Sequence, residues 1–594
     1  MKNSFNSMKI QFFIFISIFT LKVFSHNCVH GLKKLNQTQF IDAYKGDDDK
    51  RFLQAGWTPI RIYVDYTTLL AQTSFEPEIL PAIKKVIDQT VRMFQNIIKV
   101  KRLKSKLVFS SCGDSIVPDS ISNIGVDADM VIFPIFDSTI QESVEAYASS
   151  CVQDLRTGKP VAGLIAFTRN FNFTKANWLE YNTYLAFHEL THIFVFSDNL
   201  WKYFKDSYGN PIPIENIIAD SIVNGLPRKK IITPLVVSTA RKHYNCPTLD
   251  GVELENQGGE GTKNSHWESR TMLTDYMIGR SYDDSVISEI TLAFFEDSGW
   301  YKVNFYTGGL FRFGKNMGCD FLNSKCIINQ KSQFPSQFCD DTKIPTCSNS
   351  RFTKGFCLIA NYKNPLNSNY VYFSSPNVGG FEFADYCPVP ISIQGKDSYL
   401  SLNCVYGVTN NYPLELEENV SSKSACFIST LVNKNYLTIM SSFVDVNKAI
   451  CYAYSCNDIK KVVSISVGNS TAECPTNGGV TTINNYAGVL YCPDYNSICT
   501  KDKQCISMTD CALKMVNPLK DTDSYSYSIN YTVPTGKGYI IYNADGGMTS
   551  GIVSGEGVNF TDYNQYWNNN NSHCIFIKHT YVVFFMIYYI LYFV

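Results

Sequence analysis

Residues 186–196 read AFHELTHIFVF, an apolar run that carries two histidines and a glutamate. The longer segment 177–196 has no glycine or proline, so it is predicted to form a mostly buried helix. Residues four apart share one face of a helix, so His188 and His192 can direct their imidazoles to one point while Glu189 projects close by. A purely structural role would bury three polar groups, at a cost of about 2 kcal/mol or more for each unpaired group.

The spacing His-x-x-x-His is typical of a metal site. Two histidines on one helical turn supply two of the nitrogen ligands that zinc binds at about 2.0–2.1 Å, and a catalytic zinc site adds a third protein ligand and a position for water. With eight histidines in the chain, the motif His-Glu-x-x-His arises by chance in on the order of one per cent of such sequences. His243 (in RKHYNC) and His266 (in NSHWES) are both candidates for the third ligand, and their spacing does not choose between them.

The flanking segments predict an α+β fold. Residues 61–67 (RIYVDYT), 128–136 (ADMVIFPIF) and 161–171 (VAGLIAFTRNF) are predicted strands. Residues 78–100 and 287–297 carry apolar side chains at three- and four-residue spacing and are predicted helices. Beyond Cys347, cysteines recur among segments rich in Gly, Asn, Ser and Tyr, which indicates a disulfide-rich β module.

Composition and termini point to export. The chain has 594 residues, 45% of them hydrophobic, and a formal net charge of −1, which disfavours a nucleic-acid partner. The first 25 residues resemble a secretory signal, and the last residues, TYVVFFMIYYILYFV, resemble a lipid-anchor signal or a single membrane span. The 20 cysteines favour an oxidising compartment, as do the Asn-x-Ser/Thr acceptor sequences at Asn172, Asn419, Asn469, Asn530, Asn559 and Asn570.

Several longer strings resemble one family. They are HELTH at 188–192, CPTLDGVELENQGGEGTKNSHWESR at 246–270, TDYMIG at 274–279, ISEITLAFFEDSGWYKVNF at 287–305 and GKNMGCDFLNSKC at 314–326. From about residue 55 to 510 the sequence is similar to leishmanolysin-type zinc metallopeptidases of the metzincin class. The resemblance implies a metzincin-like catalytic domain, with an active-site helix and a mixed sheet, followed by a disulfide-rich, mainly β C-terminal module.

The resemblance also implies site residues. His188, His192 and His266 would bind one Zn²⁺ per chain, Glu189 would be the general base, and Met277 would occupy the turn beneath the histidines. The family usually has Gly three residues after the second histidine, whereas this chain has Val195. A β-branched residue resists positive φ, so either the turn differs or the helix runs further, and activity is at risk.

Cys28 resembles the cysteine with which proforms of the family occupy the zinc; the alternative is that it pairs in a disulfide. If Cys28 leaves with a propeptide and Cys574 with an anchor signal, an even number of cysteines remains. The strand within 158–167 resembles the edge strand on which the family binds extended substrate. The expected regions are a signal peptide (1–25), a propeptide (26–51), two catalytic subdomains (52–245 and 246–345), a cysteine-rich module with a stalk (346–572) and an anchor signal or membrane segment (573–594).

Together these features predict a zinc endopeptidase that hydrolyses extracellular proteins. It is expected to be a monomer that is exported, held at the cell surface by a lipid anchor or a single span, and active on protein or peptide substrates. One alternative is a catalytically weak homologue that acts as a surface adhesion protein, and Val195 is its only support in the sequence. Another is a structural zinc site, which would require a fourth protein ligand.

Overall fold

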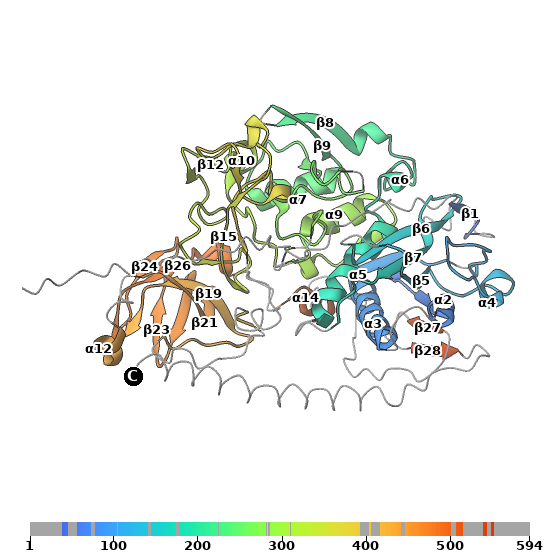
Figure 1. The fold of residues 1–594 in the computed structure, drawn as a ribbon. Helices are drawn as coiled ribbons and strands as arrows, with labels where there is room; N and C mark the ends of the chain where they lie inside the picture. Colours follow the sequence, from blue (N-terminus) through green and yellow to red (C-terminus); the bar gives the residue numbers. More distant parts are fainter. Residues whose placement is uncertain are drawn as a thin grey trace, which may run out of the picture.

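Figure 1 presents the fold as a computed structural model. The structure describes residues 38–44, 56–72, 78–103, 105–140, 144–173, 178–223, 225–259, 261–280, 282, 285–308, 310–391, 403–405, 416–440, 446–499, 507–514, 539–542 and 548–551. The predicted signal peptide, Cys28 and the apolar C-terminal tail lie outside these residues. None of the helices within the described ranges combines the length and the apolar character that a bilayer crossing requires.

A seven-stranded mixed sheet is the frame of the N-terminal half, with the strand order β1-β6-β7-β5-β3-β27-β28. Its strands are β1 (Gln39–Ile41), β3 (Ile62–Asp65), β5 (Met130–Asp137), β6 (Ala146–Asp154), β7 (Pro160–Thr168), β27 (Tyr539–Tyr542) and β28 (Met548–Gly551). The pairs β3–β5 and β5–β7 are parallel, whereas β6 runs antiparallel to β7. The predicted strands at 61–67, 128–136 and 161–171 correspond to β3, β5 and β7.

Both faces of this sheet are buried. Alternate residues of β5 and β7 enter two separate apolar clusters, which explains why these strands read as continuous hydrophobic runs. One face packs against α3 (Ile79–Ile97) and α5 (Trp178–Phe194), whose apolar side chains belong to the larger cluster. The other face is covered by side chains of residues 103–128, which Cys112 links to β6 through a disulfide with Cys151.

The prediction for the edge strand is wrong. The strand within 158–167 is β7, and it pairs on both sides, with β5 and with β6. The outer strand next to it is β6, which is covered on its far side only by β1 and only at residues 152–154 in the described part of the chain. A strand that is buried on both faces has a continuous hydrophobic sequence, whichever strands are its neighbours. The sequence pattern therefore does not reveal the strand order.

The middle of the chain forms a further group of elements, whose buried side chains join the larger apolar cluster. It contains the three-stranded sheet β8 (Ile218–Val223), β9 (Leu226–Ile231) and β10 (Val252–Glu253), and the helices α7 (Pro234–Tyr244) and α9 (Glu289–Asp297). Two further strands, β4 (Ile98–Lys101) and β2 (Trp57–Pro59), form a second small sheet with β11 (Tyr301–Val303). The shorter helices are α2 (Thr67–Ala71), α4 (Asp119–Ser122), α6 (Asp198–Trp201), α8 (Ser269–Met272) and α10 (Gly318–Asn323).

A disulfide-rich β module follows, at the left of Figure 1. Its main element is an antiparallel sheet in the order β23-β22-β21-β19-β26-β24, formed by β19 (Ser424–Ser429), β21 (Lys448–Asn457), β22 (Val462–Val467), β23 (Ser470–Glu473), β24 (Gly479–Thr481) and β26 (Leu490–Cys492). A smaller sheet contains β14 (Thr346–Cys347), β15 (Lys354–Leu358) and β18 (Val389–Ile391). The predicted α+β fold with a disulfide-rich β module is confirmed.

Disulfides connect these layers. Besides Cys112–Cys151, the pairs in which both cysteines are described are Cys246–Cys319, Cys326–Cys387, Cys339–Cys357, Cys347–Cys426, Cys404–Cys451, Cys456–Cys499 and Cys474–Cys492. Such bonds persist in oxidising compartments. The disulfide content therefore favours secretion or an extracellular location.

The chain returns to its N-terminal half after the β module. Helix α14 (Met508–Lys514) packs against α3 and α5, where the side chain of Asn96 donates a hydrogen bond to the carbonyl oxygen of Ala512. The hairpin β27–β28 extends the main sheet, and β27 pairs antiparallel with β3. Residues beyond 507 thus contribute to the N-terminal half of the fold; the expected domain boundaries remain predictions.

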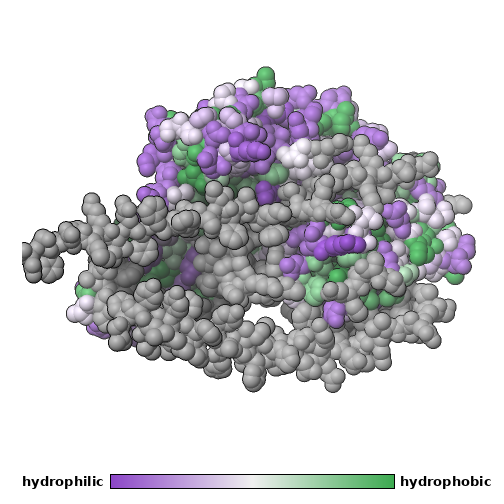
Figure 2. All heavy atoms as spheres, viewed as in Figure 1, coloured by the Kyte–Doolittle hydropathy of each residue, from purple (hydrophilic) through white to green (hydrophobic). Residues whose placement is uncertain are grey.

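The described part of the surface in Figure 2 is mostly hydrophilic over the β8–β9 hairpin at the top of the view. Green patches there are small and separate. Exposed apolar side chains such as Ile222 and Ile459 sit at turns of hairpins and are scattered over the chain. Singly exposed apolar residues are common on soluble domains and indicate no particular partner.

Candidate metal centre

The helix α5 brings His188 and His192 to one point. Both side chains lie on the same face, because the residues are four apart on an uninterrupted helix. Their Nε2 atoms are 3.2 Å apart. Both are buried: His188 is 6% exposed and His192 is fully enclosed.

His266 completes the cluster from a distant part of the chain. Its Nε2 atom lies 3.2 Å from Nε2 of His188, and the ligating atoms of His188, His192 and His266 all lie within 4.8 Å of one another. His243 is not part of this cluster: it lies on α7, where its Nε2 contacts the carbonyl oxygen of Phe313 at 2.8 Å and its ring stacks on Phe311. Of the two candidates that the sequence left open, the structure brings only His266 to the helix.

Backbone carbonyl groups orient all three rings. Nδ1 of His188 lies 2.7 Å from the carbonyl oxygen of Tyr276, and Nδ1 of His192 lies 2.7 Å from that of Phe196. Nδ1 of His266 lies 2.9 Å from the carbonyl oxygen of Thr262. Because a carbonyl can only accept, each Nδ1 carries the proton and each Nε2 presents a lone pair.

Three converging lone pairs fit a cation. Two acceptor nitrogens at 3.2 Å repel each other unless a proton or a metal ion lies between them, and the Nδ1 bonds already take the protons of the neutral rings. A tetrahedral zinc ion with bonds of about 2.0–2.1 Å would place its nitrogen ligands about 3.3 Å apart. The donor set and its spacing therefore fit zinc, and the carbonyl partners are the supporting contacts that metal-binding histidines ordinarily have.

Glu189 lies between the two helical histidines in sequence and is fully buried. Its neighbour on the next turn, Ile193, packs against the sheet: a Cβ atom on Gly163 of β7 would lie 2.6 Å from Cγ2 of Ile193. The helix is thus seated directly on β7, with its histidine-bearing end beside the outer strand β6. Because Glu189 follows His188 directly in α5, it lies on the same helical turn as the two histidines.

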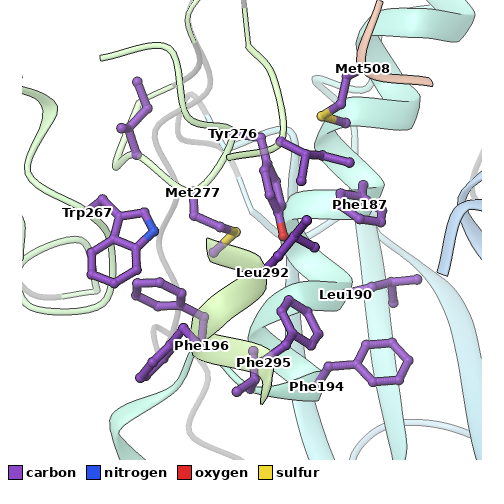
Figure 3. Close-up of a cluster of buried hydrophobic side chains, with 14 of the residues drawn as sticks. Phe187, Leu190, Phe194, Phe196, Trp267, Tyr276, Met277, Leu292, Phe295 and Met508 are labelled. Carbon is purple, nitrogen blue, oxygen red and sulfur yellow. The ribbon is translucent and has the colours of Figure 1, made fainter. Parts of the chain in front are cut away.

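A tight turn at residues 274–278 contacts His188 through the carbonyl oxygen of Tyr276. Figure 3 shows Tyr276 and Met277 of this turn. Met277 is fully buried, and Figure 3 shows its side chain between Trp267 and Tyr276. The amide of Met277 donates to Oδ1 of Asp275 at 2.7 Å, and its carbonyl oxygen accepts from the amide of Trp267. The turn thereby fixes Trp267, the residue after His266. It also fixes the carbonyl group of Tyr276, which orients His188.

Tyr276 holds this turn against the helix. Its carbonyl oxygen contacts His188, and its hydroxyl lies 3.1 Å from Oγ1 of Thr191 on the next turn of α5. Its ring packs 4.9 Å from the ring of Phe187. Burial raises the pKa of the Tyr276 hydroxyl, so it is a neutral packing and hydrogen-bonding group.

The loop that carries His266 is held by contacts that involve Glu255 and Glu268, both of which are fully buried. The amide of Glu255 donates to the carbonyl oxygen of His266 at 2.8 Å, and Asn256 donates through its side chain to Glu268 at 2.5 Å. Burial raises the pKa of Glu255 to about 8 and also raises the pKa of Glu268. The strings containing these residues carried the family resemblance, but no sequence signal assigned them a supporting role.

The turn after α5 accommodates Val195 with ordinary backbone. The helix ends at Phe194, and the amides of Val195 and Phe196 both donate to the carbonyl oxygen of Thr191 at 2.9 Å. Val195 is not among the described residues with positive φ, and its side chain is fully buried. The turn therefore forms without a left-handed residue, and it delivers the carbonyl of Phe196 to His192.

Comparison with known proteins agrees with this architecture. The family profile described as leishmanolysin (peptidase M8) matches residues 78–505. A leishmanolysin homolog of Crithidia fasciculata is 28% identical over 466 residues, which cover 73% of this chain and 66% of that protein. Leishmanolysin of Leishmania tropica is 26% identical over 70% of this chain and 62% of its own length. A leishmanolysin-like peptidase of Caenorhabditis elegans is 30% identical over 44% of this chain and 48% of its own length.

The alignments thus span less than two thirds of the length of these relatives. Within this chain, the matched segment contains α5, His266, the turn at Met277 and most of the cysteine-rich module. The family profile covers well over half of the sequence, and the chain therefore belongs to the leishmanolysin family of peptidases.

Proposed function

We propose that the protein is a zinc-dependent endopeptidase that cleaves extracellular proteins, with His188, His192 and His266 as zinc ligands and Glu189 as general base. The observation that carries this proposal is the convergence of three Nε2 lone pairs, each ring held by a carbonyl at Nδ1. The family membership of the chain supports the same reaction class.

Zinc bound by three neutral imidazoles would polarise the scissile carbonyl and lower the pKa of a coordinated water towards about 7. Glu189 then accepts a proton from the attacking water as the water oxygen bonds to the carbonyl carbon. The same carboxyl group delivers that proton to the leaving nitrogen as the C–N bond breaks. The products are a carboxylic acid and an amine.

An open coordination position distinguishes a catalytic from a structural zinc site. Among the described residues, the cluster that could hold a metal ion comprises the three histidines without a fourth histidine, cysteine or acidic side chain. This composition favours the catalytic alternative. Cys28, proposed as the ligand of the proform, lies outside the described residues.

The adhesion alternative relied on Val195. Because the turn after α5 forms without positive φ and still orients His192, this residue gives the alternative no support. We further propose that the protein is exported through a signal peptide, carries Asn-linked glycans, acts as a monomer, and is held at the cell surface by a lipid anchor or a single span.

The test is proteolysis and metal analysis on one purified, processed sample. We expect about one zinc per chain, cleavage of casein, and loss of cleavage after chelation that is restored by added zinc. A peptide hydroxamate should inhibit, because it binds only an open metal site. Stoichiometric zinc without cleavage of casein or of a peptide library would contradict the proposal and favour a binding protein.

A further inference from the structure

The loop at residues 255–268, which carries His266, is contacted by a turn much further along the chain. This turn, residues 381–387, contains the 3₁₀ helix η4 (Glu382–Ala384) and is here called the downstream turn. The disulfide Cys326–Cys387 fixes its last residue. The turn falls inside the segment 346–572 that the sequence predicts to be a cysteine-rich module and stalk. Its contacts connect that segment to the third candidate ligand.

The orientation of His266 depends on the position of Thr262. Nδ1 of His266 lies 2.9 Å from the carbonyl oxygen of Thr262, and the hydroxyl of Ser265 donates to the same oxygen at 3.0 Å. The amide of Thr262 donates to the carbonyl oxygen of Gly259 at 3.3 Å. A shift of Thr262 would therefore move the hydrogen-bond partner of the ring whose Nε2 faces the candidate metal site.

Phe383 of the downstream turn packs beside Thr262 and is 4% exposed. A Cβ atom on Gly258 would lie 2.8 Å from Cε1 of Phe383 and 2.8 Å from Cβ of Thr262. A Cβ atom on Gly279, two residues after Met277, would lie 2.5 Å from Cγ2 of Thr262 and 3.3 Å from Cδ1 of Phe383. Thr262, Phe383 and the two glycines thus form one close-packed group, so the position of Thr262 depends on the ring.

Asp385 of the downstream turn binds the loop at a second point. The side-chain amide of Asn256 donates to Oδ1 of Asp385 at 3.1 Å and to Oε2 of Glu268 at 2.5 Å. Arg228 donates to Oδ2 of Asp385 at 2.6 Å, and the side chains of this ion pair are 3% and 11% exposed. Glu268 lies two residues after His266, so a single amide group connects Asp385 to both ends of the loop.

We propose that Phe383 and Asp385 are positioning residues of the metal centre, which hold the loop so that the ring of His266 reaches the two histidines of α5. This inference rests on the proposed zinc peptidase function. A helix places the two histidines of α5, whereas the loop has no helix or strand in its described residues, 255–259 and 261–268. Removal of groups that support metal ligands ordinarily lowers metal affinity by about 10–100-fold.

The first test compares Phe383→Ala with Phe427→Ala in the processed protein. Phe427 is a fully buried residue of β19 and belongs to a different apolar cluster from Phe383. Both substitutions remove a buried ring, so both should lower the urea midpoint of the zinc-free protein. The zinc dissociation constant, measured by competition with a chelator, should rise about tenfold in Phe383→Ala and stay unchanged in Phe427→Ala. No rise in Phe383→Ala, or an equal rise in both variants, would overturn the role of Phe383.

The link through Thr262 has its own test. Gly279→Ala should weaken zinc binding, because the added Cβ atom would lie 2.5 Å from Cγ2 of Thr262 and displace that residue. Thr262→Ser removes this methyl group and keeps the backbone carbonyl that orients His266. The double variant should therefore bind zinc more tightly than Gly279→Ala alone, and Thr262→Ser alone should match the wild type. Equal zinc affinity of Gly279→Ala and the double variant would overturn the link.

Asp385→Asn keeps the shape of the side chain and suits the left-handed backbone at this position, where φ is 53°. It removes the charge opposite Arg228, so the zinc dissociation constant should rise about tenfold. Glu418→Gln is the matched control, because it breaks a half-buried ion pair with Lys354 inside the β module and should leave zinc binding unchanged. An unchanged constant in Asp385→Asn would overturn the role of Asp385.

Zinc affinity is measured without substrate, so the two proposals can fail separately. Absence of casein cleavage by the zinc-loaded wild type would refute the proposed function, yet it would leave the affinity comparisons standing. Cleavage by the wild type, together with wild-type zinc affinity in Phe383→Ala and Asp385→Asn, would overturn the positioning role alone.

Discussion

Nδ1 of His192 donates a hydrogen bond of 2.7 Å to the carbonyl oxygen of Phe196, four residues further along the chain. The turn after α5 therefore orients the ring that the helix has just presented. This turn contains Val195 where the family resemblance implied glycine, and it forms without a left-handed residue. The orientation of this candidate metal ligand depends on the position of the Phe196 carbonyl group and not on the residue type at position 195.

Val195→Gly should destabilise the protein without raising its activity. The substitution removes a fully buried side chain and adds backbone freedom, so we expect a loss of about 3 kcal/mol in the free energy of unfolding. The measurement is denaturant unfolding of the zinc-loaded protein together with kcat. Val195→Ala, the matched control, should lose less, and a rise in kcat for Val195→Gly would show that valine impairs the enzyme.

Glu189→Gln should abolish most catalysis while zinc stays bound. The amide keeps the size of the side chain but cannot accept a proton, and general acid–base catalysis contributes about 10²–10⁴-fold. We expect kcat/KM to fall by at least about 100-fold with unchanged zinc content. Glu189→Asp, which keeps the acid but shortens the side chain, should retain more activity than Glu189→Gln. Full activity of Glu189→Gln would remove this residue from the mechanism.

His266→Ala should lose zinc, and His243→Gln should keep it. The first removes one of the three converging nitrogens, whereas His243 lies outside the cluster and contacts Phe313. The number of zinc ions bound per folded chain, measured on dialysed protein, distinguishes His266→Ala from His243→Gln. Chelation should also lower the Tm of the wild type, because an ion that binds only the folded state stabilises it. Zinc loss from His243→Gln together with retention by His266→Ala would reverse the assignment of the third ligand.

His243 should make the protein acid-sensitive. Burial lowers the pKa of its ring to about 4, below the value of about 6.5 of an unfolded histidine. Between these values the unfolded chain binds the extra proton, so stability is full above about pH 6.5 and falls as the pH decreases towards 4, by at most about 3 kcal/mol. His243→Gln can still donate to Phe313 and does not titrate. Urea midpoints between pH 7 and 5 should therefore fall less steeply for this variant than for the wild type, and equal slopes would contradict the assignment.

Much of the frame was predictable from periodicity. The helices α3, α5 and α9 and the strands β3, β5 and β7 follow directly from the spacing of their apolar residues. The helical position of His188 and His192 follows from the same pattern. The third ligand was open on residue spacing alone, because loop segments carry no periodic signal, and only the family resemblance selected His266.

Other parts of the site leave little trace in the sequence. The groups that orient the three rings are backbone carbonyls of Phe196, Tyr276 and Thr262, which any residue type could supply. The outer strand β6 (AYASSCVQD) has small and polar residues in place of a clear hydrophobic pattern and was not among the predicted strands. The edge role had been assigned to 158–167 from the family resemblance. The pairing of β1 with β6 is likewise a contact between distant segments, and only the fold brings them together.

The pairing of Asp65 with Tyr539 joins residues 474 positions apart in the sequence. Closing so long a loop is slow compared with forming local helices and hairpins. During synthesis, β3 therefore waits with one edge unsatisfied until nearly the whole chain has entered the folding compartment, and in that interval it can pair wrongly. Chaperone demand and yield on expression should consequently depend on residues 539–551, although they lie far along the chain from every proposed ligand.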